Sequence, residues 1–584
     1  MKKIFRRGLS FLLVAILLLG LGAECFAEGT LNEFTDLSFA LPGDSDTARL
    51  APQNTSAGET LFLPSQAACK ALTVHFTPNN TAAEFTAVGA LGTAELSDGA
   101  SLDLPALCGA GDRFELTLRA AVNELACERR LTVICTDGIA SMYLKSDDPV
   151  GHGREWVESA KSNKATGTML MLDAAGEAVY DGKLTQIKGR GNSTWLQAKK
   201  PYQIKLKEKT DLLQSGEKAN ANKTWILLAN AVDASLLRNQ IVYTMAGQSG
   251  LACAVQCRPV NLYYDGEYRG AYLLSEKVEI NKGRVDIHKL EDDFETANPD
   301  VTDFDALSVA TDVTANGAAY VYCEGLNTPA DYSGGYLLEM DTKPRAEAEK
   351  CYFRTKRNQY VVVKSPEFCS KDAMAYIAGY YQEYEDAVYG HGTNPETGKP
   401  LSDYVDLESV AQCYLVNEVT KNLDTFRSSA YLYKDTGESV MKMGPIWDYD
   451  LCLGTGGEYP TGFYSLLHPL VLQLYQYGDF RVTVREVYEN RIIGQLLSEK
   501  GTALASIAEL RDTLAPSAAA NAVLWGGTAG LWNERVDDVA VYLRERDAFL
   551  TEAYSSWNGE TADPIAAKEY SDVRPDDWYF DNIM

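Results

Sequence analysis

Histidine and positive charge are both scarce in this sequence. Five histidines occur in 584 residues. None of them flanks Cys253 and Cys257, the most closely spaced cysteines, so these cysteines do not form the pattern of a zinc site. Lysine and arginine number 54 against 81 aspartates and glutamates, which gives a net charge of −27. Such a polyanion repels phosphate backbones, so we do not expect nucleic acid as a partner.

Long apolar runs are missing beyond the first 27 residues. Those residues combine four basic side chains, the apolar run from Leu12 to Leu21 and small residues ending at Ala27, which is the pattern of a secretory signal peptide. Glu24 stands where a lipoprotein signal needs a small residue before Cys25. A membrane anchor formed by this run is the alternative, but no later stretch approaches the roughly 20 apolar residues of a spanning helix. We expect a secreted protein, associated with the cell surface or cell wall, and not an integral membrane protein.

Cysteines give no disulfide framework. Eleven of the 12 follow residue 27, an odd number at irregular spacings. Cys127 and Cys135 are candidates to link neighbouring strands, and most of the others lie in apolar contexts typical of buried thiols.

Two differently patterned regions follow the signal at 1–27. Residues 29–138 contain short alternating segments separated by turn-forming residues, which predicts an all-β immunoglobulin-like sandwich that acts as a spacer or binding module. Residues 139–557 mix strand and helix patterns and predict an α+β domain. Strands are expected at 168–172, 183–188, 202–206, 224–228 and 260–264, and helices at 234–248, 407–421 and through 492–556.

The last residues have a pattern of their own. A polar linker at 558–569 precedes 570–584, where Tyr570, Asp572-Val573 and Trp578-Tyr579 follow the opening of an S-layer homology repeat. This segment resembles the start of such a repeat, cut short, and the resemblance implies a cell-wall polysaccharide as a partner. A disordered polar tail is the alternative, although such tails rarely contain several aromatic residues.

Two acidic clusters lie near each other in the sequence. Asp424 is followed by Asp448 and Asp450, 24 and 26 residues later, after a β-rich segment with a turn at 435–437. That turn predicts a hairpin that brings the three carboxylates together. Grouped carboxylates suit Mg²⁺ and phosphate chemistry, in which one acid orients a hydroxyl nucleophile and others hold the metal.

Glycines and lysines precede these acids in a second candidate segment, residues 188–206. Gly189 and Gly191 allow a tight turn whose backbone N–H groups suit a phosphate, and Lys205 follows on the next strand. By itself, a Gly-x-Gly hairpin is more often an ordinary turn.

Three more segments of the sequence are candidates for functional or structural roles. Residues 227–239 place Asp233 as a helix N-cap and Arg238 in the second helical turn, where an arginine can be fixed against carboxylates. Residues 262–278 predict a hairpin with an Asp-Gly turn that leads into a charged link, and 334–341 predict a strand that ends in two acids. Structural roles alone would also explain each of these stretches.

Taken together and in this order, the five stretches resemble the spore-coat protein H (CotH) kinase family, an atypical branch of the protein-kinase-like fold, over about residues 140–557. The resemblance implies ATP with Mg²⁺ or Mn²⁺ as cofactors and phosphoryl transfer to serine or threonine of a protein substrate. It makes Asp424 and Asp448 catalytic, Lys205 the phosphate-binding lysine and 274–278 the link beside adenine. The implied cofactor contacts are Gly189, Arg190, Gly191, Asn192, Ser193, Lys205, Arg238 and Glu276, and the implied metal ligands are Asp448, Asp450 and Ser429.

Departures from the kinase pattern leave alternatives open. Asn422-Leu423 stand where ordinary kinases have His-Arg, and Ser429 stands where a metal-binding asparagine is usual. The expected helix at 234–248 also has no acid to pair with Lys205. A non-catalytic surface adhesin or cell-wall scaffold is therefore the second hypothesis. A carbohydrate-active hydrolase with paired acids is the third, but it leaves the glycine and lysine segment unexplained.

Overall fold

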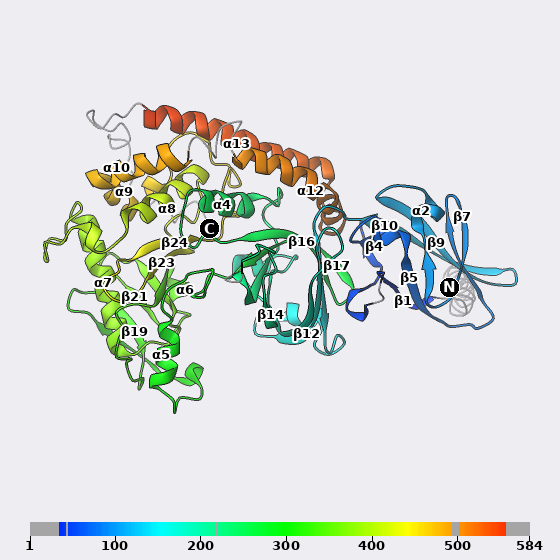
Figure 1. The fold of residues 1–584 in the computed structure, drawn as a ribbon, viewed down its shortest axis with the longest axis horizontal. Coiled ribbons are helices and arrows are strands. Elements are labelled where there is room, and N and C mark those ends of the chain that lie inside the picture. The colour runs from blue at the N-terminus through cyan, green and yellow to red at the C-terminus, as the bar shows by residue number, and fades with distance from the viewer. Residues whose placement is uncertain (1–33, 43–44, 218–219, 493–501, 556–584) are drawn as a thin grey trace, which may run out of the picture. The chain divides into compact units, whose positions relative to one another are not determined.

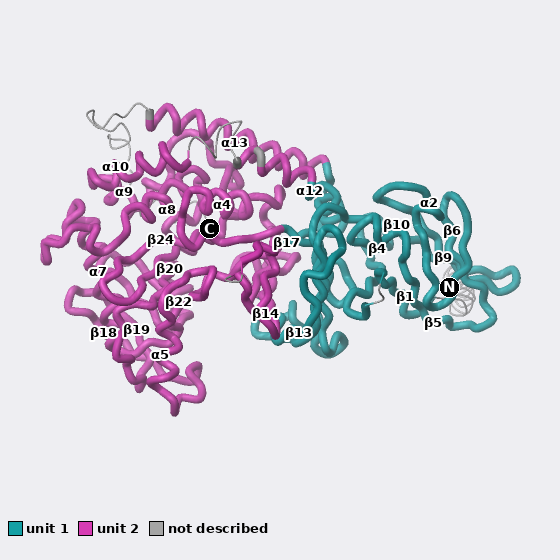
Figure 2. Tube along the Cα trace, viewed as in Figure 1, with its two compact units in different colours: residues 1–189, 259–272, 513–529 teal, residues 190–258, 273–512, 530–584 magenta. Residues whose placement is uncertain are grey.

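The computed structural model describes residues 34–42, 45–217, 220–492 and 502–555. The expected signal peptide at 1–27, the linker at 558–569 and the repeat at 570–584 lie outside these ranges. None of the helices within the ranges combines the length and apolar content needed to cross a bilayer. The chain divides into two compact units (Figure 2): residues 1–189, 259–272 and 513–529, and residues 190–258, 273–512 and 530–584.

The first unit begins with two β-sheets that share one apolar core. Alternation along β9 buries Phe114, Leu116 and Leu118 in that core and turns the intervening residues outward. The smaller sheet has the order β2 (Arg49–Leu50), β1 (Phe34–Ala40), β5 (Leu72–Pro78), β8 (Ala100–Leu102). The larger has the order β3 (Gln53–Thr55), β4 (Gly58–Leu63), β10 (Leu125–Cys135), β9 (Arg113–Val122), β6 (Glu84–Gly89), β7 (Gly92–Leu96), and α2 (Leu104–Cys108) is the short helix of this part.

The cysteine pairing expected in this region is wrong. Cys127 and Cys135 lie on the same strand, β10, and cannot link neighbouring strands. Cys135 instead lies beside Cys69, with 2.7 Å between the two buried Sγ atoms.

The remainder of the first unit is a further set of paired strands. β12 (Lys164–Leu172) pairs antiparallel with β11 (Ala140–Ser146) and β13 (Ala178–Gly189), and β11 pairs in parallel with β16 (Cys257–Tyr264). Helix α3 (Arg154–Ser159) lies between β11 and β12 in sequence. The strands expected at 168–172, 183–188 and 260–264 are therefore confirmed, each somewhat longer than the pattern indicated.

The second unit contains a seven-stranded sheet covered by helices. Its strand order is β18 (Val309–Val313), β19 (Ala319–Cys323), β21 (Tyr352–Arg354), β22 (Tyr360–Ser365), β20 (Tyr336–Asp341), β23 (Ala430–Lys434), β24 (Lys442–Ile446). The same unit contains β14 (Tyr202–Thr210), which pairs with β15 (Asn222–Leu228), and β15 in turn pairs with the last residues of β17 (Glu267–Glu276). The longer helices are α4 (Arg238–Gln248), α5 (Leu290–Ala297), α7 (Lys371–Tyr389), α8 (Leu407–Thr420), α9 (Pro469–Gln476), α10 (Gly478–Val487) and α13 (Ala529–Ser555), while α12 (Thr502–Trp525) crosses the boundary between the units.

Helix α8 is the centre of the second unit. Every residue from 409 to 420 is buried, as expected for a helix that is apolar on nearly all sides. Asp406 caps its N-terminus by accepting a hydrogen bond from the Ser409 N–H at 2.7 Å. The helix ends at Thr420, and Figure 1 shows it beside β23 and β24. This position places the chain that leaves α8 next to the hairpin formed by those two strands.

Candidate active site

The β23–β24 hairpin brings the predicted carboxylates together. The two strands pair antiparallel, with Ala430 opposite Ile446, as the turn at 435–437 predicted. The residues after β24 then run beside the end of α8. The Leu423 N–H donates to the Leu451 carbonyl at 3.0 Å, and the Leu453 N–H donates to the Thr420 carbonyl at 2.8 Å. These bonds join the segment that contains Asp424 to the segment that contains Asp448 and Asp450.

The backbone around Asp448 is unusual. Asp448 and Ser429 both have positive φ angles, 70° and 55°, a conformation that residues other than glycine adopt uncommonly, in turns and at functional sites. The Ser429 hydroxyl donates to Asp448 Oδ2 at 3.4 Å, and the Asp448 N–H donates to the Tyr243 hydroxyl at 3.3 Å. The side chain at 429 therefore faces the acid, as a metal ligand in that position would have to do.

Burial and mutual repulsion disfavour charge on two of the acids. Burial, followed by the charges of Asp448, Asp233 and Asp424, raises the pKa of Asp450. Burial, followed by the charge of Asp448, likewise raises the pKa of Asp424. A bound cation or a proton would therefore stabilise these two acids.

The donors fit magnesium chemistry. Three carboxylates and one hydroxyl supply hard oxygen atoms, and Mg²⁺ is typically held by one or two protein carboxylates together with substrate phosphates and water. Within the described residues, no group of three or more His, Cys, Asp or Glu side chains is placed so that it could hold a metal ion by itself. A metal bound here would need substrate phosphate or water among its ligands, as Mg²⁺ in phosphoryl-transfer sites does.

Arg190 is a cation whose charge acts on Asp448 in the acidic cluster. Its guanidinium stacks on the Trp447 ring at 5.3 Å. Burial lowers the pKa of Arg190, and the charge of Asp448 opposes that effect more than any other group does. Its backbone N–H donates to the Pro201 carbonyl at 3.2 Å.

The rest of the glycine segment forms a turn. Gly189 is the last residue of β13, and Gly191 has φ +85° with no room for a side chain, because a Cβ would lie 2.3 Å from Thr194 Oγ1. Asn192 and Ser193 are exposed at the start of a short 3₁₀ turn. The structure thus confirms the need for glycine at 191 and places Asn192 and Ser193 at the surface.

Lys205 lies on the solvent side of β14. Ile204 and Leu206 are buried on one face, and Lys205 is exposed on the other. Glu276 is buried at the end of β17, where Oε2 accepts a hydrogen bond from the Gln256 N–H at 2.9 Å and burial raises its pKa to about 7. Neither side chain is among those that line the acidic cluster.

Arg238 has a positioning role that the sequence did not reveal. Helix α4 begins at Arg238 and not at 234, because the Asp233 carboxylate accepts the N–H groups of Ser235 and Arg238 at 3.0 and 2.9 Å. The buried Arg238 guanidinium pairs with Asp233 and donates to the Cys452 carbonyl at 2.8 Å. It therefore fixes the segment after Asp450, a role different from the predicted cofactor contact.

Asn239 and Asn417 hold Tyr449, which lies between two of the acids, and Glu339 lies on a neighbouring strand. Asn239 Oδ1 accepts the Tyr449 N–H at 2.8 Å, and Tyr449 in turn donates its hydroxyl to Asn417 Oδ1 at 2.9 Å. Glu339, on the strand that pairs with β23, is buried, and burial raises its pKa to about 7. The stretches at 227–239 and 334–341 contain Asn239 and Glu339, but nothing in their spacing showed what these residues contact.

A mixed domain of β-sheet and helices, with aspartates gathered by one hairpin beside an arginine, fits a kinase-like protein. The family model for CotH kinase protein matches residues 187–550, and the chain belongs to this family. The match confirms the resemblance over most of the predicted region and leaves 1–186 and 551–584 outside it. No curated protein matches the chain. Membership implies that the protein uses ATP and a divalent metal.

Proposed function

We propose that this protein is a secreted CotH-type kinase that transfers the γ-phosphoryl group of ATP to serine or threonine hydroxyls of a protein substrate. The observation that supports this most directly is the gathering of Asp424, Asp448 and Asp450 by the end of α8 and the β23–β24 hairpin. Bound ATP with Mg²⁺ or Mn²⁺ would supply the transferable group.

We assign a separate role to each residue of the cluster. Asp424 orients the acceptor hydroxyl and receives its proton, for which a raised pKa is an advantage. Asp448 and Asp450, with the Ser429 hydroxyl, are the metal ligands. Arg190, which lies beside Asp448, is our candidate for the cation that binds phosphate, in place of the exposed Lys205.

Phosphoryl transfer from labelled ATP with Mg²⁺ or Mn²⁺ tests this proposal on wild type, Asp424→Ala and Asp448→Ala. Wild type should label itself or an added protein, and both variants should lose the activity. Wild type should also melt at a higher temperature with nucleotide and metal present, since a ligand that binds the folded state stabilises it. If wild type shows neither label transfer nor this shift, it is not a kinase.

The flanking regions support a role at the cell surface. We propose that residues 1–27 direct export, that 29–138 form an immunoglobulin-like spacer or binding module, and that 570–584 belong to an S-layer homology repeat that binds cell-wall polysaccharide. Cell fractionation tests the location. A pull-down with purified cell wall, using chains with and without a completed repeat, tests the attachment.

One observation favours a non-catalytic alternative, a surface adhesin or scaffold with a pseudokinase domain. Ser429 supplies a hydroxyl where a kinase usually has an amide carbonyl, which is the better magnesium ligand. ATP is also scarce outside cells. Cell-wall binding that persists in Asp424→Ala, together with absent transfer in wild type, would establish this alternative.

A further inference from the structure

An open groove lies beside the segment that contains Asp424. It has a volume of about 740 Å³, within the range of roughly 300–1,000 Å³ that ligand sites occupy. Five segments supply its walls: the β20–α6 connection, the β21–β22 turn, the end of α7, the segment between α8 and β23, and the start of α9. We call it the acceptor groove, and its main lining residues are Lys343, Pro344, Arg357, Tyr360, Tyr389 and Leu470.

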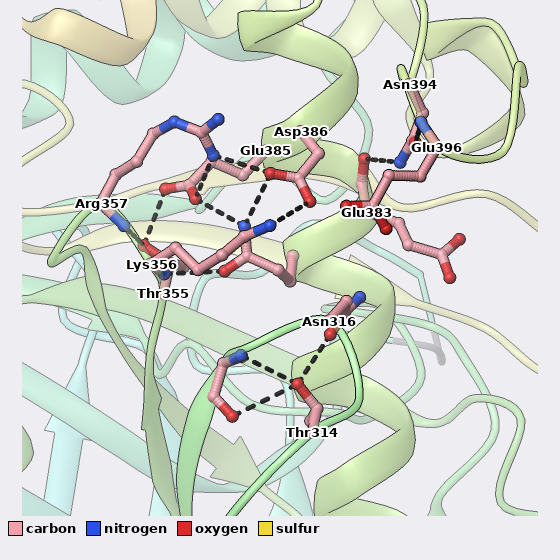
Figure 3. Close-up of polar contacts among 12 residues, drawn as sticks. Thr314, Asn316, Thr355, Lys356, Arg357, Glu383, Glu385, Asp386, Asn394 and Glu396 are labelled. Carbon is pink, nitrogen blue, oxygen red and sulfur yellow. Dashed lines mark hydrogen bonds and ion pairs between the residues drawn. The ribbon is translucent and has the colours of Figure 1, made fainter.

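The wall that contains Arg357 is built in advance. Figure 3 shows Arg357 between Glu385 and Asp386, and its Nη1 donates to them at 3.0 and 2.8 Å. Thr355 Oγ1 also donates to Glu385, at 2.7 Å, and Lys356 Nζ donates to Asp386 at 3.0 Å. Because both acids are buried on α7, these bonds hold the β21–β22 turn in one place.

The lining is mostly apolar. Tyr360, Tyr389, Pro344 and Leu470 contribute ring and aliphatic surface, and the Arg357 guanidinium covers the Tyr389 ring at 4.1 Å. His468 adds an uncharged imidazole at neutral pH, since burial lowers its pKa to about 4. Burial of an apolar side chain of a ligand in the groove is therefore favourable.

The charged side chains of the lining are arranged to favour an anion. Lys343, Arg357 and Arg427 line the groove together with Asp341 and Glu385. When the side chains paired with these residues are included, namely Arg345, Lys356, Glu347 and Asp386, the positive charges number five against four. Each acid has an arginine within 3.5 Å, Arg345 for Asp341 and Arg357 for Glu385. In a chain with a net charge of −27, this local excess of positive charge complements an acidic ligand.

The groove is continuous with the catalytic segment. Arg427 lines it, and the Arg427 N–H donates to the Asp424 carbonyl at 3.0 Å. Arg345 connects the two sides, since its Nη1 lies 3.5 Å from Asp341 and 3.3 Å from the Ser428 hydroxyl. A polypeptide seated in the groove therefore passes beside the residue that we assign as catalytic base.

We propose that the acceptor groove binds the substrate polypeptide, and that this polypeptide has an aromatic or aliphatic residue and an acidic residue close to the serine or threonine that receives phosphate. The proposal rests on the phosphoryl transfer proposed above and adds a sequence preference to it. The apolar residue enters among Tyr360, Tyr389 and Leu470, and the acidic residue lies near Lys343.

Three fluorescent peptides test the preference on the full chain. The first contains phenylalanine and glutamate near a serine, the second replaces phenylalanine with alanine, and the third replaces glutamate with lysine. The first should have a Kd and a KM at least about tenfold lower than the others, the effect of burying one apolar side chain or satisfying one charge. Equal values for all three peptides would overturn the proposal.

A charge reversal at the groove tests the location. Lys343→Glu/Pro344→Glu changes two exposed residues of the lining and should raise the KM for the first peptide about tenfold, with kcat at saturating peptide retained. Lys399→Glu/Pro400→Glu makes the same change at an exposed Lys-Pro pair outside the lining and should leave KM as in wild type. If the two double variants change the KM for the first peptide equally, the groove is not the peptide-binding site.

The two proposals fail in different ways. Fluorescence anisotropy measures peptide binding without catalysis, so groove-dependent binding with no label transfer would disprove the kinase and leave the docking site intact. Label transfer with no peptide preference and no effect of Lys343→Glu/Pro344→Glu would disprove the docking site and leave the kinase intact.

Discussion

The ion pair between Arg546 and Glu418 allows a sharp test of how the acidic segments are held. Both side chains are completely buried, on α13 and α8. Arg546 Nη2 donates to the carbonyl and to Oε1 of Glu418, both at 2.7 Å, and Nη1 donates to the carbonyls of Pro460 and Gly462 at 2.8 and 2.6 Å. The pair thus joins two helices to the segment that follows Asp450.

Arg546→Met keeps an apolar side chain in the space but removes all four hydrogen bonds. Breaking a buried ion pair by removing one partner typically costs about 3–5 kcal/mol, because the remaining charge is left in the interior. Glu418 still accepts the N–H groups of Tyr464 and Ser465 at 2.7 and 2.8 Å. We therefore expect a loss near the lower end, about 3 kcal/mol. In Glu418→Leu/Arg546→Met the loss should be smaller than the sum of the single losses, because no charge is left behind.

Denaturant unfolding, together with hydrogen exchange of α13 peptides, measures this loss, since exchange reports the opening of the helix itself. Arg544→Met is the matched control, because Arg544 is exposed two residues earlier on the same helix. It should change stability by less than about 0.5 kcal/mol. A loss below about 1 kcal/mol for Arg546→Met, or strict additivity in the double variant, would refute the reasoning.

Three other substitutions probe the site. Ser429→Asn should lower the Mg²⁺ concentration for half-maximal transfer and Ser429→Ala should raise it, because an amide carbonyl binds metal better than a hydroxyl and Ser429 faces Asp448. Arg190→Met should raise the KM for ATP about tenfold while Lys205→Met leaves it nearly unchanged, as steady-state kinetics would show, since Arg190 lies beside Asp448 and Lys205 is exposed. Burial raises the pKa of Glu339 to about 7, so its contribution to stability is present below its ordinary pKa of 4.5 and lost as pH rises through 7. Glu339→Gln should therefore be more stable than wild type at pH 8, by up to about 3 kcal/mol, and similar at pH 4, as urea unfolding at both pH values would show.

Several strands were predictable because alternating apolar and polar residues show which side chains of a strand are buried. Tyr202, Ile204 and Leu206 are apolar at every second position of β14 and are buried as expected. The same alternation places Lys205 on the opposite, exposed face, and its predicted role as the phosphate-binding lysine stays a prediction. The family resemblance assigned a function to Lys205, whereas the alternation of apolar and polar residues along β14 correctly gave the orientation of its side chain.

The start of α4 was not predictable from sequence. Asp233 followed by an apolar stretch is a normal N-cap signal, and it predicted a helix from 234. The helix begins four residues later because Asp233 binds the Arg238 N–H and guanidinium, while the same guanidinium binds the Cys452 carbonyl. The local Asp233 bonds set this boundary, and the bond to Cys452, 214 residues away, adds a contact that no short window of sequence contains.

Sequence distance explains why the acids could be grouped from the sequence, whereas Arg190, which the resemblance implied only as a cofactor contact, could not be placed beside them. Asp424 and Asp448 are separated by a single hairpin, so closing the connection costs little entropy and the turn residues alone imply the contact. Arg190 precedes these acids by more than 200 residues and reaches them only through the packing of the whole unit. Catalytic groups carried by one supersecondary element can therefore be inferred from its turn. The groups that position phosphate and acceptor around them depend on the complete fold, and in this protein they are the residues that most need direct measurement.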